Sequence, residues 1–161
     1  MIDNLSIRNF KSITNLNIDS RRINVFIGEP NTGKSNILEA LGMISWCGYG
    51  QPELKEYVRF QGTQNLFYDE LLDRPIRIHT ENLELEIIFK DDKFHIEGVL
   101  KKEGEKPTKN TISTLDYSGN PKRTIKSLQE VKFVKLYRLT KQNIFLDPFS
   151  SFLFASSVLL R

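Results

Sequence analysis

Apolar and polar residues nearly alternate at the beginning of the chain. The alternation runs from Ile2 to Phe10, and Leu16 and Ile18 continue it after a short break. A period of two places the apolar side chains on one face of a strand. We therefore expect two neighbouring strands that form a hairpin.

The next segment, RINVFIGEP, combines an apolar run with the start of a glycine-containing loop. Its residues Ile23, Val25, Phe26 and Ile27 form a short, mostly β-branched run. Such runs are typical of a central strand that is covered on both faces. The pattern predicts a buried strand that leads into the loop.

Helical spacing begins at Lys34. The apolar residues that share one helical face from there are Ile37, Leu38, Leu41 and Ile44, and the stop signals that follow are Gly48, Gly50 and Pro52. The order is therefore strand, glycine loop, helix.

The middle of the chain is rich in alternating segments. Residues 75–80, 83–89 and 94–100 predict antiparallel strands, with a turn at 90–93. Residues 101–110 are polar and predict a mobile hairpin or loop. Further on, residues 131–139 predict another strand, and the apolar stretch 149–160 predicts a helix that needs cover from more chain or from a partner.

Composition narrows the class of protein. The 161 residues suffice for one domain, and a net charge of +3 from 23 basic and 20 acidic residues is too small to argue for nucleic acid by bulk attraction. The single cysteine, Cys47, excludes an intrachain disulfide and fits a reducing compartment. Without a signal peptide or an apolar run of membrane-spanning length, the sequence predicts a cytoplasmic protein with no membrane association.

The loop between the predicted strand and helix carries the clearest chemistry. GEPNTGKS has the spacing of a P-loop, so we expect ATP and Mg²⁺ as ligands. Successive amides of the segment Glu29, Pro30, Asn31, Thr32 and Gly33 would wrap the β-phosphate. Gly28 would permit a tight turn, and Gly33 would let the backbone approach the phosphate. Lys34 would reach the β and γ oxygens, and the Ser35 hydroxyl would ligate Mg²⁺.

Two motifs together resemble a known group of ATPases. Asn9, Phe10, Lys11 and Ser12 end the first strand, and the P-loop has Asn31 in its middle and Asn36 after Ser35. Over residues 2–44 this resembles the ABC-type heads of structural-maintenance-of-chromosomes, RecF-like and OLD (overcoming lysogenisation defect) proteins, within the AAA family ATPase superfamily.

The resemblance implies an α/β fold, namely the N-terminal lobe of an ABC-ATPase-like P-loop NTPase. Residues 1–50 would hold the hairpin, the P-loop strand and the helix, and 51–139 a mainly antiparallel β-subdomain. Residues 140–161 would hold a Q-loop-like segment and an apolar helix. Gln142 would ligate Mg²⁺ and sense the γ-phosphate, with Gln61 and Gln64 as rivals. Lys11 would lie near the nucleotide, and an ordinary surface lysine is the alternative.

The acidic pair that ATP hydrolysis requires is not evident. Asp147 ends the strand-like NIFLDP but is followed by proline, and YSGN at 117–120 is a poor match to the Ser-Gly-Gly signature. Asp91 and Asp92 fit a turn, and His79 and His95 fit strands. We therefore expect the N-terminal lobe of a larger ATPase, with a C-terminal lobe and a second head as partners and with catalytic residues unknown.

Three function classes follow. The first is Mg-ATP binding by such a head in DNA repair, chromosome or phage-defence machinery, with DNA contacted through the full-length protein. The second is a complete small P-loop nucleotide or metabolite kinase, which would need helices, parallel strands and a basic lid after the loop. The third is a non-catalytic interaction domain that retains the loop.

Overall fold

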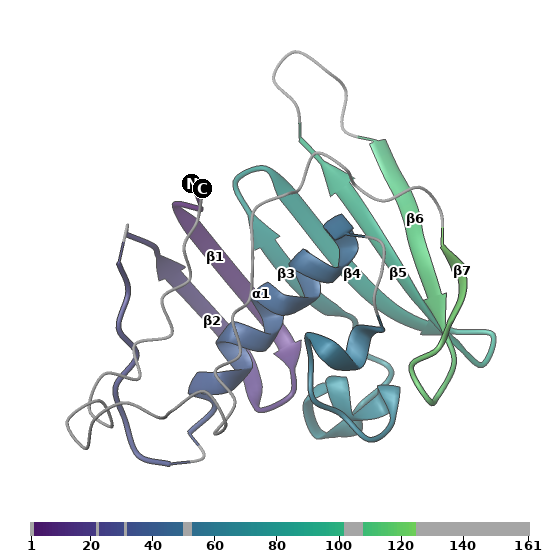
Figure 1. Cartoon of the computed structure of the whole chain (residues 1–161), viewed down its shortest axis with the longest axis horizontal. Coiled ribbons are helices and arrows are strands. Elements are labelled where there is room, and N and C mark those ends of the chain that lie inside the picture. Colours follow the sequence, from purple (N-terminus) through teal and green to yellow (C-terminus); the bar gives the residue numbers. More distant parts are fainter. Residues whose placement is uncertain (1, 22, 31, 50–52, 102–107, 125–161) are drawn as a thin grey trace, which may run out of the picture.

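The computed structural model describes residues 2–21, 23–30, 32–49, 53–101 and 108–124. One antiparallel sheet of seven strands, in the order β2-β1-β3-β4-β5-β6-β7, carries helix α1 (Lys34–Tyr49) across one face (Figure 1). The strands are β1 (Asn4–Phe10), β2 (Ile13–Asp19), β3 (Ile76–Thr80), β4 (Leu83–Lys90), β5 (Lys93–Leu100), β6 (Thr108–Leu115) and β7 (Pro121–Thr124). Three 3-10 helices, Leu54–Glu56, Thr63–Leu66 and Tyr68–Glu70, lie between α1 and β3.

The expected N-terminal hairpin is confirmed, and β1 pairs on both sides. It is antiparallel to β2, with Ile7 opposite Leu16, and antiparallel to β3, with Ile7 opposite Ile78. The hairpin therefore belongs to the same sheet as the strands from the middle of the chain.

The strands predicted from alternation in the middle of the chain are also confirmed. β3, β4 and β5 coincide with the three alternating segments, and β4 and β5 pair from Leu83↔Leu100 to Lys90↔Lys93. Asp91 and Asp92 form the turn, with φ values of 53° and 54°. Aspartate tolerates the left-handed region better than most residues, which explains why this pair suits the turn between β4 and β5.

α1 and the covered face of the sheet form the core. Of the helical face predicted from the sequence, Ile37, Leu41 and Ile44 are buried and Leu38 is half-buried. They pack with sheet residues that include Ile7, Phe10, Ile78, Leu85 and Ile96. On another side of α1, a Cβ at Gly42 would lie 2.8 Å from the carbonyl oxygen of Tyr57, so only glycine permits this close approach.

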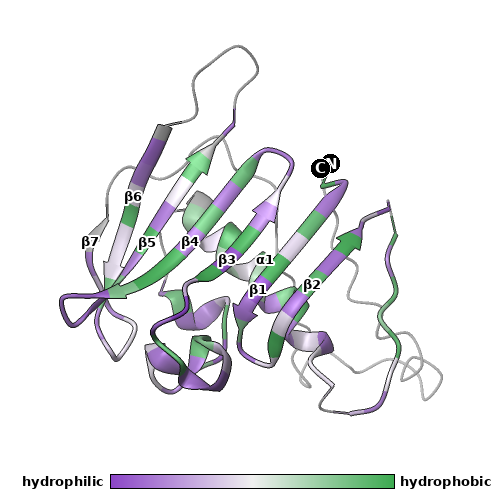
Figure 2. Ribbon diagram, turned by 180° about the vertical axis from the view of Figure 1, so that it is seen from behind, coloured by the Kyte–Doolittle hydropathy of each residue, from purple (hydrophilic) through white to green (hydrophobic). Residues whose placement is uncertain are grey.

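Hydrophilic and hydrophobic residues alternate along the strands (Figure 2). In β3 and β4 the buried positions alternate with charged residues such as Arg77 and Glu86, which therefore lie on the opposite face of the sheet. Glu86 of β4 is directly opposite Glu97 of β5, an arrangement that is repulsive by itself. Lys109 of β6 lies between them, with its Nζ 2.9 Å from Glu86 and 2.5 Å from Glu97, and Arg77 of β3 donates to Glu86 at 2.9 Å. Two cations thus compensate the two carboxylates across four strands.

The prediction of a buried strand over residues 23–27 is wrong for this structure. These residues belong to no strand, and the exposed fractions of Ile23, Val25, Phe26 and Ile27 are 78, 63, 38 and 91%. The segment leaves the sheet edge after β2 and leads to the start of α1 (Figure 1). A central strand needs neighbours on both edges, and no described segment pairs with this one.

Part of the polar segment 101–110 also differs from the prediction. Thr108–Leu115 forms β6, which pairs with β5 from Phe94↔Leu115 to Leu100↔Thr108. Threonine-rich strands with few large apolar residues give a weak alternation signal, and for this reason the sequence did not reveal β6. The strand predicted at 131–139 and the apolar stretch 149–160 lie outside the described residues.

Cys47 is buried on α1, and burial raises the pKa of its thiol to about 12. It is therefore a protonated packing residue. In the part of the chain that the structure describes, no helix combines the length and apolar character needed to cross a bilayer.

Replacing isoleucine by alanine at two sites tests the burial pattern. Ile78→Ala empties a fully buried position in the middle of the sheet and should lower the free energy of unfolding by about 2–5 kcal/mol. Ile27→Ala should change it by no more than about 0.5 kcal/mol, because this side chain is almost fully exposed. Urea denaturation followed by circular dichroism measures both, and equal losses would show that residues 23–27 are buried in solution.

The carboxylates on the polar face predict a dependence of stability on pH. Partial burial raises the pKa of Glu86, but hydrogen bonds from Lys109 and Arg77 outweigh this effect, so the pKa lies below its ordinary value of 4.5. The stabilisation is complete above the unfolded-state pKa and is lost as the pH falls through the lower folded-state pKa. Between about pH 5 and about pH 3, the free energy of unfolding should fall more steeply for the wild type than for Glu86→Gln. Parallel curves in urea titrations would contradict this.

Candidate nucleotide-binding site

The P-loop curls around the ammonium group of Lys34. The Nζ atom donates to the carbonyl oxygens of Gly28 at 2.8 Å and Glu29 at 2.5 Å, and to Thr32 Oγ1 at 3.1 Å. The Thr32 hydroxyl in turn donates to the Glu29 carbonyl oxygen at 2.9 Å. Residues 28–30 and 32 are exposed, so this curled loop lies at the surface with a cation at its centre.

α1 begins at the end of this loop. The Asn36 amide donates to the Gly33 carbonyl oxygen at 2.9 Å, which closes the first turn directly after the loop. The amides at the start of a helix have no acceptor within it, and the helix dipole places partial positive charge there. Lys34 and Ser35 are the first two residues of α1, and Ser35 is exposed.

The two glycines of the motif have different roles. Gly33 has a φ of +85°, and a Cβ there would lie 2.6 Å from Ser12 Oγ. Gly28 has no positive φ, and a Cβ there would lie 3.5 Å from Thr32 Oγ1, an ordinary contact. Backbone conformation and space thus require glycine at position 33, whereas neither requires it at position 28.

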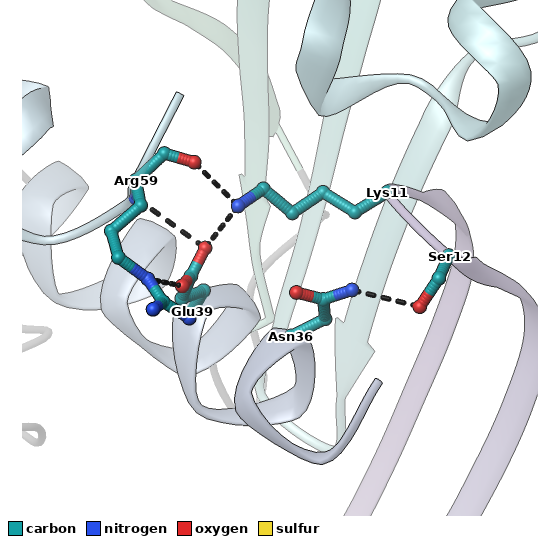
Figure 3. Close-up of polar contacts among 5 residues, drawn as sticks. All are labelled: Lys11, Ser12, Asn36, Glu39 and Arg59. Carbon is teal, nitrogen blue, oxygen red and sulfur yellow. Dashed lines mark hydrogen bonds and ion pairs between the residues drawn. The ribbon is translucent and has the colours of Figure 1, made fainter. Parts of the chain in front are cut away.

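The β1–β2 turn lies beside the start of α1 (Figure 3). The four residues of the first-strand motif, Asn9 to Ser12, are each bonded or buried. The Asn9 side chain donates to the Pro75 carbonyl oxygen at 3.1 Å, and Phe10 is fully buried. Ser12 Oγ accepts a hydrogen bond of 2.8 Å from Asn36 Nδ2, and Lys11 Nζ donates to a carboxylate of α1. The two motifs that carry the family resemblance therefore touch each other.

That carboxylate belongs to Glu39, which the sequence analysis did not single out. Its side chain is only 5% exposed, and it forms ion pairs with Lys11 and with Arg59, whose Nε lies 2.6 Å from Glu39 Oε1 (Figure 3). A signal was present in the sequence, because Glu39 is a charged residue between Leu38 and Ala40 on a largely apolar helix. Its partners, 28 and 20 residues away, were not predictable from spacing.

Several other candidates are accounted for. Asp116, before YSGN, accepts hydrogen bonds from the amides of Ser118 and Asn120, and this segment is the turn between β6 and β7. His79 lies on β3 and His95 on β5, and the described residues contain no group of three His, Cys, Asp or Glu side chains suited to a metal ion. Asn31, Gln142 and Asp147 lie outside the described residues. Gln61 lies two residues before the 3-10 helix Thr63–Leu66, and Gln64 lies within that helix.

A comparison with protein families identifies the chain. The model of the AAA ATPase domain matches residues 1–152. The chain belongs to this family. The expected kinship with AAA family P-loop ATPases is thereby confirmed, and the mixed α/β architecture with an antiparallel sheet agrees with it.

The loop of this AAA ATPase domain has the donors that a Mg-nucleotide requires. Lys34 supplies three ammonium protons at the centre of the loop, and the first turn of α1 supplies amides. Phosphate oxygens are stronger acceptors than carbonyl oxygens because they are charged, so a phosphate can replace the Gly28 and Glu29 carbonyls on Lys34. In this structure the two carbonyls and Thr32 Oγ1 occupy Lys34 Nζ, so a phosphate would have to displace them.

Alanine at each glycine of the loop tests their different roles. Gly33→Ala should lower the free energy of unfolding by about 1–3 kcal/mol, because its left-handed backbone disfavours a Cβ and Ser12 would have to move. Gly28→Ala should cost no more than about 0.5 kcal/mol. Chemical denaturation without nucleotide measures the pair, and an equal effect at both positions would contradict the described loop.

Proposed function

We propose that this AAA ATPase domain binds Mg-ATP as the N-terminal half of an ATPase head of the structural-maintenance-of-chromosomes, RecF-like or OLD kind. The observation that carries the proposal is the position of Lys34, whose ammonium group lies at the centre of the loop and at the N-terminus of α1. A cation, first-turn amides and a helix dipole directed to one point favour a multiply charged anion.

Each loop residue has a role in this proposal. The amides of Glu29, Asn31, Thr32 and Gly33 surround the β-phosphate, and Lys34 moves its hydrogen bonds from loop carbonyls to the β and γ oxygens. Ser35 ligates Mg²⁺ with its hydroxyl, and Asn36 holds the first turn through Ser12. Gln142 is a proposed second Mg²⁺ ligand.

The exposed segment 23–27 supports a further lobe as partner. Four large apolar side chains in five residues are unusual at a surface unless another element covers them. The segment leads directly into the P-loop, so an element that covers it would also bear on the nucleotide. We propose that the C-terminal lobe of the same ATPase supplies this cover, in a head that dimerises with a second copy.

Hydrolysis then depends on groups outside the described residues. An attacking water needs a carboxylate or a comparable group to orient it. Among the described residues, no group of three His, Cys, Asp or Glu side chains is suited to hold a metal ion. The C-terminal lobe and the second head would supply these groups, and DNA repair, chromosome or phage-defence machinery is the proposed setting. Slow or absent turnover is the expected behaviour of the 161-residue chain.

Replacement of the P-loop lysine tests the proposal. Lys34→Ala removes a charged hydrogen-bond donor worth about 1.5–3 kcal/mol, so Mg-ATP affinity should fall at least about tenfold. Lys93→Ala, at an exposed lysine in the β4–β5 hairpin, is the matched control and should bind as the wild type does. Isothermal titration calorimetry measures the dissociation constants.

Three results decide between the function classes. Equal affinity of wild type and Lys34→Ala, or no binding by the wild type, would overturn the proposal and favour an interaction domain. Phosphate transfer to a small acceptor by the chain would instead indicate a kinase. Lys34-dependent binding with little turnover is the result that supports the half-site.

A further inference from the structure

Two consecutive residues of the β1–β2 turn bind two residues of α1. Lys11 pairs with Glu39, and Ser12 accepts a hydrogen bond from Asn36 (Figure 3). Residues three apart lie on the same side of a helix, so both contacts fall on one face of the first turns of α1. We call these four residues the turn–helix contact.

Lys11 is fixed at both its backbone and its side chain. Its amide donates to the Leu66 carbonyl oxygen at 2.9 Å, and its φ of 53° is in the left-handed region, which a lysine adopts only under constraint. Its side chain is 13% exposed, and Nζ donates to Glu39 and to the Arg59 carbonyl oxygen. The ammonium group is thus held by Glu39 and the Arg59 backbone, whereas the P-loop carbonyls surround Lys34.

The ion pairs of the Glu39 carboxylate resist rotation and sliding of α1. A carboxylate that is 95% covered is costly to leave without partners, and Lys11 and Arg59 between them satisfy both of its oxygens. Rotating or sliding α1 would separate these charges. Because α1 is one continuous helix from Lys34 to beyond Glu39, a fixed Glu39 also fixes the first-turn amides and Lys34.

We propose that Lys11 is a positioning residue for the P-loop, acting through Glu39 on α1 and not by touching the nucleotide. This inference rests on the proposed Mg-ATP binding and adds a specific role for the first-strand motif. The β1–β2 turn aligns α1, and α1 aligns the phosphate-binding amides. The family resemblance implies that Lys11 lies near the nucleotide, and direct contact of Lys11 with the nucleotide is the competing outcome.

A double-mutant cycle separates these outcomes. Lys11→Met keeps the aliphatic stem and removes the charge, and Glu39→Gln keeps the shape and removes the charge. Each should weaken Mg-ATP binding by about tenfold. The double variant should bind no more weakly than the weaker single variant, because both substitutions break the Lys11–Glu39 pair and only Glu39→Gln also breaks the pair with Arg59. Lys11→Arg should retain most of the affinity. Lys90→Met, at an exposed lysine ending β4, is the control and should bind as the wild type does.

The result that would overturn the proposal is additivity. If Lys11 touches the nucleotide, Lys11→Met will weaken binding by the same factor in the Glu39→Gln background as in the wild type. Thermal unfolding without ligand checks that each variant is folded at the assay temperature. Should a single variant unfold, the neutral double variant is compared with Lys11→Arg, and equal affinity of these two would refute any role of the charge pair.

Amide hydrogen exchange without nucleotide gives an independent readout. Loss of the turn–helix contact should speed exchange at residues 36–41 of α1 at least about threefold in Lys11→Met and Glu39→Gln, and leave it unchanged in Lys90→Met. Unchanged exchange in all variants would overturn the proposal. If the wild type binds no Mg-ATP while exchange still rises, the proposed function fails and the contact is structural only, which also overturns the positioning role.

Discussion

The pairing of β1 on both of its edges is the constraint on which the described structure depends. β1 lies between β2 and β3, and its pairing with β3 ends at Arg8. Its last residue, Phe10, pairs with Ile13 of β2 on one side and forms an isolated bridge with Phe67 on the other. The turn that follows can therefore occupy only a narrow region, directly beside the start of α1. From this position Lys11 and Ser12 reach Glu39 and Asn36, and the P-loop is held where the helix begins.

The same constraint relates fold to chemistry. α1 packs its apolar face on the sheet and directs its N-terminus toward the loop, so the burial of Ile37, Leu41 and Ile44 sets the direction of the helix dipole. The loop that curls around Lys34 therefore lies at the N-terminal end of the helix in this two-layer arrangement of sheet and helix. Membership in the AAA ATPase domain family supports nucleotide binding by the domain as a whole.

The sequence was most informative where one periodicity extended over many residues. Alternation revealed β3 to β5, helical spacing revealed α1, and the Asp91–Asp92 turn followed from residue type. The prediction was wrong for residues 23–27, because an apolar run shows that a segment requires cover but not whether the rest of the described chain supplies it. β6 was missed because its threonines and Ser113 give little contrast between faces.

The sequence also predicted only part of the candidate site. Spacing predicts Gly33, Lys34 and Ser35 as candidates, but Glu39 and Arg59 become neighbours of Lys11 only when the sheet, the helix and the 3-10 region assemble. Such contacts depend on tertiary structure, which a local pattern does not encode.

The burial of Cys47 has a practical consequence. The thiol is 1% exposed and stays protonated, and electrophiles react with thiolates at accessible sites. A maleimide or disulfide reagent can therefore react with Cys47 only when α1 separates from the residues that cover this thiol. Since the chain has one cysteine, the rate at which Cys47 is alkylated reports how often α1 separates in this way, and no label has to be introduced.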